Sequence, residues 1–110
     1  MRALSIRQPY AELILRGIKK IEYRSRPTRI IGERFYIYAA RKPGDPKGFD
    51  ELGCVPGDPG VPTGVIVGSA TVTRCTRHNG TYEWHLTDVK RLKRTRKPKG
   101  MPQPVWSRPF

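Results

Sequence analysis

The chain has 110 residues, with 22 Lys or Arg against 9 Asp or Glu, so its formal net charge is +13. This length predicts one domain over residues 1–110. Positive charge of this size opposes compaction by self-repulsion and is typical of proteins whose partner is a polyanion, a nucleic acid first and an anionic membrane surface second. We expect no membrane partner, because no amphipathic basic helix with a bulky apolar face is visible, and no apolar run approaches the roughly 18 residues that a membrane span needs.

Cysteine usage and the amino-terminal residues indicate the compartment. The opening stretch MRALSIRQPYAEL lacks the apolar region of a signal peptide, so we expect a cytoplasmic protein with Cys54 and Cys75 reduced. A structural zinc ion needs about four Cys or His ligands. The spacing of Cys54, Cys75, His78 and His85 matches no zinc module. We therefore expect neither a metal nor a cofactor.

The first predicted elements are a short strand and a short helix. Apolar and polar residues alternate over residues 3–6, which is typical of a strand. Pro9 suits the first turn of a helix, because its missing N–H would be unpaired there anyway. Gly17 suits the left-handed position that ends a helix. The helix is therefore expected at residues 9–16.

The next element, residues 19–25, again alternates and predicts a strand. Because side chains alternate across a strand, Ile21 and Tyr23 share one face, and Glu22 and Arg24 share the other. The question raised by this strand is whether its charged face is an ordinary solvated surface or the wall of a site for an anion.

The rest of the chain predicts strands separated by one long loop. Residues 33–40, which are rich in aromatic residues, predict the clearest strand. Residues 41–63 hold most of the Pro and Gly and predict a long loop with one helical turn. Strands are expected at residues 64–75 and 82–92, joined by a hairpin turn at Asn79-Gly80.

These elements define the fold class that we expect. Five or six short strands, mostly antiparallel, with one or two short helices indicate an α+β fold in which the sheet closes into a small β-barrel and leaves no exposed edge. Gly68, inside the strand 64–75, indicates a bulge.

One motif connects the sequence to a known family. Gly17, Lys19, Glu22 and Arg24 form G-x-K-x-x-E-x-R, and this motif follows SIRQPY in the first ten residues. Together with GSATVTRC, YEWHL and KGMPQPVW further along, it closely resembles the ASCH domain family of the PUA-like superfamily over nearly the whole chain. One departure is Tyr10, where the family usually has Trp. The resemblance implies a PUA-like barrel that binds nucleic acid, with RNA favoured over DNA.

The three charged residues of the motif each suit nucleotide binding. Lys19 is a compact charge for a phosphate. Arg24 offers a planar fork for a phosphate or a guanine edge. Glu22 can orient Arg24 or accept a hydrogen bond from a base amino group. The alternative is a surface pair of Glu22 and Arg24 that contributes less than about 1 kcal/mol.

Two groups of residues extend the predicted nucleic-acid site. Near the start of the helix, Ser5 lies at the junction with the first strand, Gln8 could read a base edge, and Tyr10 could either stack on a base or pack in the core. A basic run without any carboxylate would follow a phosphate backbone, unless it is a flexible tail. The run extends from Lys90 to Lys99, and the residues of it that we expect to bind are Lys90, Arg91, Lys93, Arg94, Arg96 and Lys97.

Two other function classes compete with binding. The first is a hydrolase that acts on nucleosides or RNA, an N4-acetylcytidine amidohydrolase or a ribonuclease, with Lys19 and Glu22 as catalytic residues and Glu83 as a further acid. The resemblance implies that the amidohydrolase subgroup has a catalytic lysine at the position of Lys19 but a threonine where this chain has Glu22, which argues against that reaction. The second is a docking protein that uses only its charge.

Overall fold

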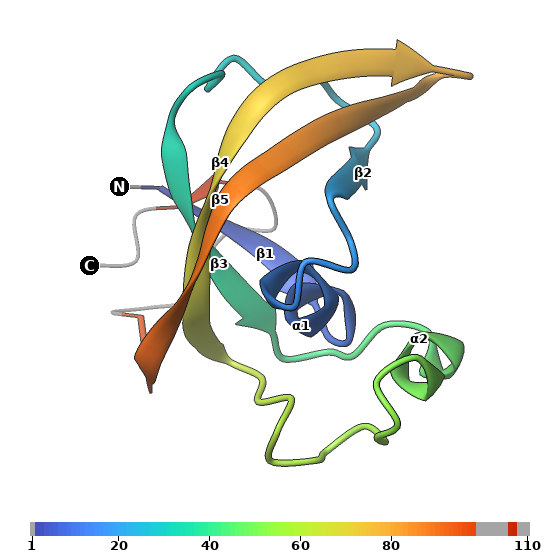
Figure 1. Cartoon of the computed structure of the whole chain (residues 1–110), viewed down its shortest axis with the longest axis vertical. Coiled ribbons are helices and arrows are strands. Elements are labelled where there is room, and N and C mark those ends of the chain that lie inside the picture. The colour runs from blue at the N-terminus through green and yellow to red at the C-terminus, as the bar shows by residue number, and fades with distance from the viewer. Residues whose placement is uncertain (1, 99–105, 108–110) are drawn as a thin grey trace.

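In the part of the chain that the computed structural model describes, residues 2–98 and 106–107, six strands form one curved sheet and two short helices lie beside it (Figure 1). The elements in chain order are β1 (Ala3–Arg7), α1 (Tyr10–Leu15), β2 (Ile21–Arg24), β3 (Arg34–Ala40), α2 (Pro46–Asp50), β4 (Val65–His78), β5 (Thr81–Arg96) and β6 (Trp106–Ser107). Each predicted strand and helix is present. The basic run also belongs to β5 as far as Arg96 and is not a tail.

The strand order is β2-β5-β4-β3-β1-β6. Every neighbouring pair is antiparallel except β1 and β3, which run parallel. The α+β, mostly antiparallel fold is thus confirmed, but the closed barrel is not, because β2 and β6 remain the two ends of the order. The gap between β2 and β1 is bridged by a side chain: Arg24 Nη2 donates to the carbonyl oxygen of Ser5 over 2.7 Å. The described part of the sheet therefore curves toward a barrel, but its two end strands, β2 and β6, are not paired with each other.

The β4–β5 hairpin forms the longest part of the sheet. Its turn is the predicted Asn79-Gly80, where both residues have positive φ, 49° and 77°, as a tight hairpin turn requires. The bulge predicted at Gly68 is confirmed, because the β4–β5 register shifts between Ile66 and Gly68. A side chain at Gly68 would press on the neighbouring strand, so glycine allows β5 to approach closely at this point.

The core lies between the concave side of the sheet and α1. Its buried members include Leu4, Ile14, Phe35, Ile37 and Trp84. Helix α1 starts after Pro9 and is followed by Gly17 at φ 76°, as predicted. No helix among residues 2–98 and 106–107 is long and apolar enough to cross a membrane.

One charged residue of α1 is unexpectedly buried. Glu12 is 3% exposed, and its carboxylate accepts two hydrogen bonds of 2.8 Å from Arg91 of β5 and one of 2.8 Å from Arg16. The pair joins α1 to β5 across the core edge. Burial would raise the pKa of Glu12, but the hydrogen bonds from Arg91 and Arg16 outweigh burial and hold this pKa below its ordinary value of 4.5.

This pair predicts how stability depends on pH. Since the pKa of Glu12 is lower in the folded state, the unfolded chain binds more protons in acid, and the stabilisation present above pH 4.5 is lost as the pH falls through the folded value. Arg91→Gln should lower the free energy of unfolding at pH 7 by about 1–2 kcal/mol, discounted for the half-exposed arginine. The free energy of unfolding of this variant should also decrease less than that of the wild type as the pH falls, as measured by urea unfolding from about pH 7 to 3. Lys93→Gln, on the same strand, is the matched control, and an unchanged acid slope in Arg91→Gln would contradict the assignment.

Candidate functional site

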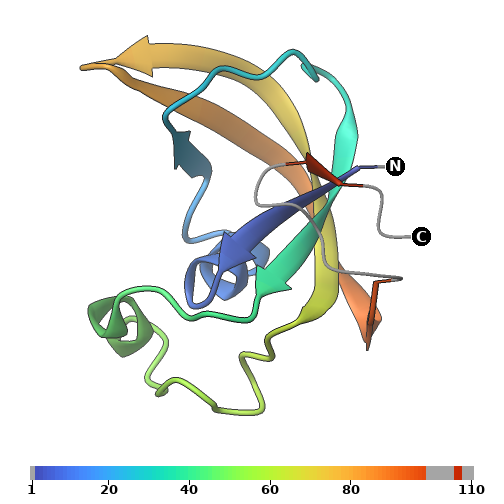
Figure 2. The same cartoon turned by 180° about the vertical axis from the view of Figure 1, so that it is seen from behind.

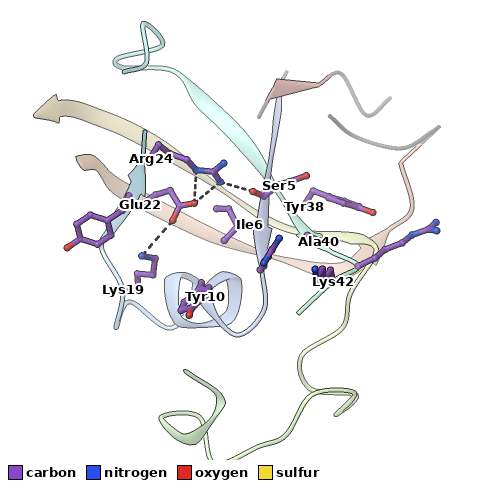
Figure 3. Close-up of a pocket in the computed structure, with 12 residues that line it drawn as sticks. Ser5, Ile6, Tyr10, Lys19, Glu22, Arg24, Tyr38, Ala40 and Lys42 are labelled. Carbon is purple, nitrogen blue, oxygen red and sulfur yellow. Dashed lines mark hydrogen bonds and ion pairs between the residues drawn. The ribbon is translucent and has the colours of Figure 1, made fainter. Parts of the chain in front are cut away.

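A cavity of about 730 Å³ opens where β1, α1, β2 and the end of β3 meet (Figure 3). The hydrogen bond from the Arg24 side chain to the carbonyl oxygen of Ser5 crosses this same gap in the sheet, so the cavity lies where β1 and β2 are not paired as strands. The inner end of the cavity is lined by residues that include Ser5, Tyr10, Lys19, Glu22, Tyr23 and Arg24. The outer end is lined by residues that include Arg7, Arg41 and Lys42.

Glu22 organises the inner end of the cavity. It is 8% exposed, and its Oε2 accepts hydrogen bonds from Arg24 Nη2 at 2.7 Å and Arg24 Nε at 3.0 Å. Its Oε1 lies 3.6 Å from Lys19 Nζ. Each carboxylate oxygen therefore faces a different cation, and Figure 3 shows the two cations on opposite sides of Glu22.

Strand β2 explains this arrangement. Glu22 and Arg24 share a face because they are two residues apart, and pairing with β5 places them opposite Trp84 and Tyr82. That face points inward, while Tyr23 between them is 55% exposed. The strand thus turns its charged pair toward the concave side and its tyrosine outward. The motif residues form the wall of a cavity and not a solvated surface pair.

Lys19 is held by aromatic rings as well as by Glu22. Its Nζ lies 4.9 Å from the ring centroid of Tyr23 and 5.7 Å from that of Tyr10, and the side chain is 18% exposed. Ring faces attract cations. Three partners therefore fix where the ammonium group sits, at the inner end of the cavity.

Arg24 is fixed just as firmly. Besides Glu22 and the carbonyl of Ser5, its guanidinium carbon lies 5.8 Å from the ring centroid of Trp84. Trp84 is buried, and its Nε1 donates to the carbonyl oxygen of Arg26 over 3.0 Å. The guanidinium is oriented in advance of any ligand, which lowers the entropic cost of binding.

The outer end of the cavity is positively charged without a counter-charge. Arg7, Arg41 and Lys42 are exposed there, and Glu22 is the single carboxylate among the lining residues. These three cations meet because β1 and β3 are parallel, with Arg7 opposite Ala40, so that both strands end at the same edge. The cavity thus combines a polar, partly neutralised inner end with a cationic outer end.

The structure brings together five of the residues predicted near the amino end, Ser5, Tyr10, Lys19, Glu22 and Arg24, but it places Gln8 elsewhere. Gln8 is 1% exposed; its Nε2 donates to the carbonyl of Pro62 at 3.0 Å, and its Oε1 accepts from the N–H of Glu12 at 3.0 Å. The carbonyl of Gln8 also accepts from the N–H of Gly44 at 2.7 Å. Gln8 therefore anchors the long loop to α1, and its burial keeps it out of reach of a base.

The basic residues of the predicted run, in β5 and directly after it, lie outside the cavity. None of the six predicted residues, from Lys90 to Lys97, lines it. Arg91 is bound to Glu12, as described above. Lys90, Lys93, Arg94, Arg96 and Lys97 have exposed side chains and form a separate positive surface.

Sequence reasoning missed the cations at the outer end and the role of Tyr23. Arg41 and Lys42 directly follow a predicted strand. This position places them beside Arg7 only because β3 runs parallel to β1, and the sequence did not predict that pairing. Tyr23 lies inside the motif, but its contact with Lys19 depends on how the turn before β2 folds back. Among residues 2–98 and 106–107, no group of three or more His, Cys, Asp or Glu could hold a metal ion.

A curved, mostly antiparallel sheet with a short helix after its first strand, and with a cavity at the open side, defines a small α+β domain. The sequence profile of the ASCH domain matches residues 4–101, and the chain belongs to the ASCH domain family. This family is often linked to RNA binding.

Two solved structures from Zymomonas mobilis are similar to the chain. The crystal structure of ASCH from this organism has a TM-score of 0.67 at 15% sequence identity, covering 96% of this chain and 85% of its own. The crystal structure of the ZmASCH S128A mutant has a TM-score of 0.60 at 15% identity, covering 87% and 72% respectively. At this identity the similarity concerns the fold. No curated protein is significantly similar to the chain in sequence.

Proposed function

We propose that this ASCH domain binds nucleic acid, RNA in preference to DNA, by accepting one nucleotide in the cavity beside β2. The observation that carries the proposal is the cluster of Lys19, Glu22 and Arg24 at the inner end of a cavity whose outer end is cationic. A nucleotide has the matching polarity, with a neutral, hydrogen-bonding base at one end and a phosphate at the other.

The inner end suits a base better than a phosphate. Glu22 repels a phosphate, whereas its carboxylate can accept a hydrogen bond from a base amino group. Tyr10 lines the same space and offers a ring for stacking. Lys19 and Arg24 share the one carboxylate of Glu22, which partly neutralises them as partners for an anion.

The outer end and β5 suit the backbone of the same strand. Arg7, Arg41 and Lys42 are exposed at the outer end of the cavity, and the exposed cations of β5 provide a second positive surface. Each phosphate that such cations neutralise releases counterions, which makes affinity depend on salt. The net charge of +13 agrees with a polyanionic partner. Cys54 and Cys75 are free thiols, which agrees with binding in the cytoplasm.

Titration of a labelled single-stranded RNA at several salt concentrations tests the proposal. We expect the affinity to fall steeply between about 50 and 200 mM salt, and Lys42→Gln to reduce the logarithmic slope by about 0.7, the value for one phosphate contact on a single strand. Glu22→Gln should weaken RNA binding about tenfold with an unchanged slope, because it removes a base contact and not a phosphate contact. A DNA strand of the same sequence should bind more weakly.

Each part of the proposal has an outcome that contradicts it. A flat salt dependence would remove nucleic-acid binding. Stronger RNA binding by Glu22→Gln would show that the inner end takes a phosphate and not a base. Lys47→Gln in α2 is the matched control for Lys42→Gln, because it removes the same charge at an exposed position outside the cavity lining.

The hydrolytic alternative uses the same residues but is less favoured by their contacts. Glu22 would have to exchange protons while its Oε2 accepts two hydrogen bonds from Arg24. Those bonds give Glu22 a positioning role. Incubation of the protein with N4-acetylcytidine and with labelled RNA tests this alternative, and product formation that disappears in Lys19→Ala would support it.

A further inference from the structure

A second hollow, which shares no lining residue with the first cavity, lies beside the distal part of the β4–β5 hairpin. Its volume is about 460 Å³. The hairpin supplies Arg74, Arg77 and Tyr82, and the segment between β2 and β3 supplies Pro27, Thr28 and Ile31. Figure 2 shows this segment passing in front of the hairpin. Residues of both line the hollow, which we call the groove.

The groove has unpaired positive charge next to an apolar wall. Arg74 and Arg77 are exposed, no carboxylate lines the groove, and neither arginine forms an ion pair with another described residue. Glu83, the nearest acid along β5, alternates to the other face of the strand, where Thr76 bonds to it. The guanidinium carbon of Arg77 lies 5.9 Å from the ring centroid of Tyr82. An anion that carries a flat apolar group fits this chemistry.

The groove and the cavity are neighbours on one face of the sheet. Tyr82, which lines the groove, is the register partner of Arg24, which lines the cavity. Such partners on antiparallel strands have Cα atoms about 4.5–5.5 Å apart and side chains on the same face. One strand of nucleic acid that leaves the cavity past Arg24 therefore meets Tyr82 of the groove next.

We infer that the groove binds the nucleotide adjacent to the one in the cavity, on the same single strand of nucleic acid. Arg77 and Arg74 contact its phosphate, and its base packs against Tyr82 and Ile31. This inference rests on the proposed function and deepens it, because it makes the ligand an oligonucleotide that crosses from β2 to the hairpin, and not a lone nucleotide.

The two ligand sizes test the groove separately from the cavity. Binding of a mononucleotide and of a single-stranded RNA about six nucleotides long is measured by calorimetry or fluorescence for wild type, Tyr82→Leu and Arg77→Gln. We expect Tyr82→Leu to weaken oligonucleotide binding about tenfold, as loss of one stacked base does, and to leave mononucleotide binding within about twofold. Arg77→Gln, at an exposed position, should weaken the oligonucleotide severalfold and lower its salt slope by about 0.7.

Lys47→Gln serves as the charge-matched control, because Figure 1 places α2 at the opposite end of the molecule from the hairpin tip. If the wild type binds the oligonucleotide and both Tyr82→Leu and Arg77→Gln bind it equally well, the inference that the groove binds a nucleotide is wrong. The proposal that the cavity binds a nucleotide would not be affected. If neither ligand binds the wild type, the proposed function itself fails. Thermal unfolding of Arg77→Gln at the wild-type temperature would exclude misfolding as the cause of a loss.

Discussion

Replacement of Gly68 by Ala should lower the free energy of unfolding by about 3 kcal/mol, the upper part of the range for overpacking. A Cβ atom at this position would lie 2.5 Å from the carbonyl oxygen of Lys90 and 2.6 Å from Leu15 Cδ2. The first contact is with backbone, which cannot rotate away. The methyl group must therefore push β5 from β4 at the paired position Gly68–Arg91 and also displace α1.

Urea unfolding measures this effect, and Gly60→Ala is the matched control. A Cβ atom at Gly60 meets only the side-chain oxygen of Asp58, at 3.3 Å, and the backbone there has no positive φ. The control should change stability by less than about 1 kcal/mol. Equal stability losses in the two variants would show that the close approach of β5 to Gly68 is not a feature of the protein.

Arg24→Met should lower the free energy of unfolding by about 2–3 kcal/mol. It leaves the carboxylate of Glu22, 8% exposed, with Lys19 at 3.6 Å as its remaining cation, and it removes the donor to the carbonyl of Ser5. Loss of one partner of a buried ion pair costs about 3–5 kcal/mol. We discount this value because the cavity admits water and the Arg24 side chain is 21% exposed.

A double-mutant cycle separates the ion pair from the bridge across the sheet. Glu22→Gln combined with Arg24→Met removes the uncompensated charge, so the double variant should be more stable than Arg24→Met alone by about 1 kcal/mol. Arg24→Lys, which keeps the charge without the planar fork, should fall between wild type and Arg24→Met. A double variant less stable than either single variant would contradict the assignment of Glu22 and Arg24 as a coupled pair.

Local patterns were sufficient to predict the elements themselves. Pro9 and Gly17 delimit α1. The ring of proline restricts φ, and glycine allows positive φ, whatever the surroundings. Asn79-Gly80 makes the hairpin turn for the same reason. The strand β5 extends further than predicted, to Arg96, because pairing with β4 overrides the low strand preference of a basic run.

The amino-acid sequence alone determined the order and type of the elements, the fold class, and the grouping of Lys19, Glu22 and Arg24, since each follows from conformational preferences and side-chain alternation within a few residues. Tertiary structure alone decided that Glu22 faces inward, that Gln8 anchors the long loop, that Arg91 binds Glu12, and that the sheet stays open beside the cavity. Each of these outcomes depends on contacts between segments far apart in the chain. A pattern within one segment holds no information about which distant partner will satisfy a buried charge or amide.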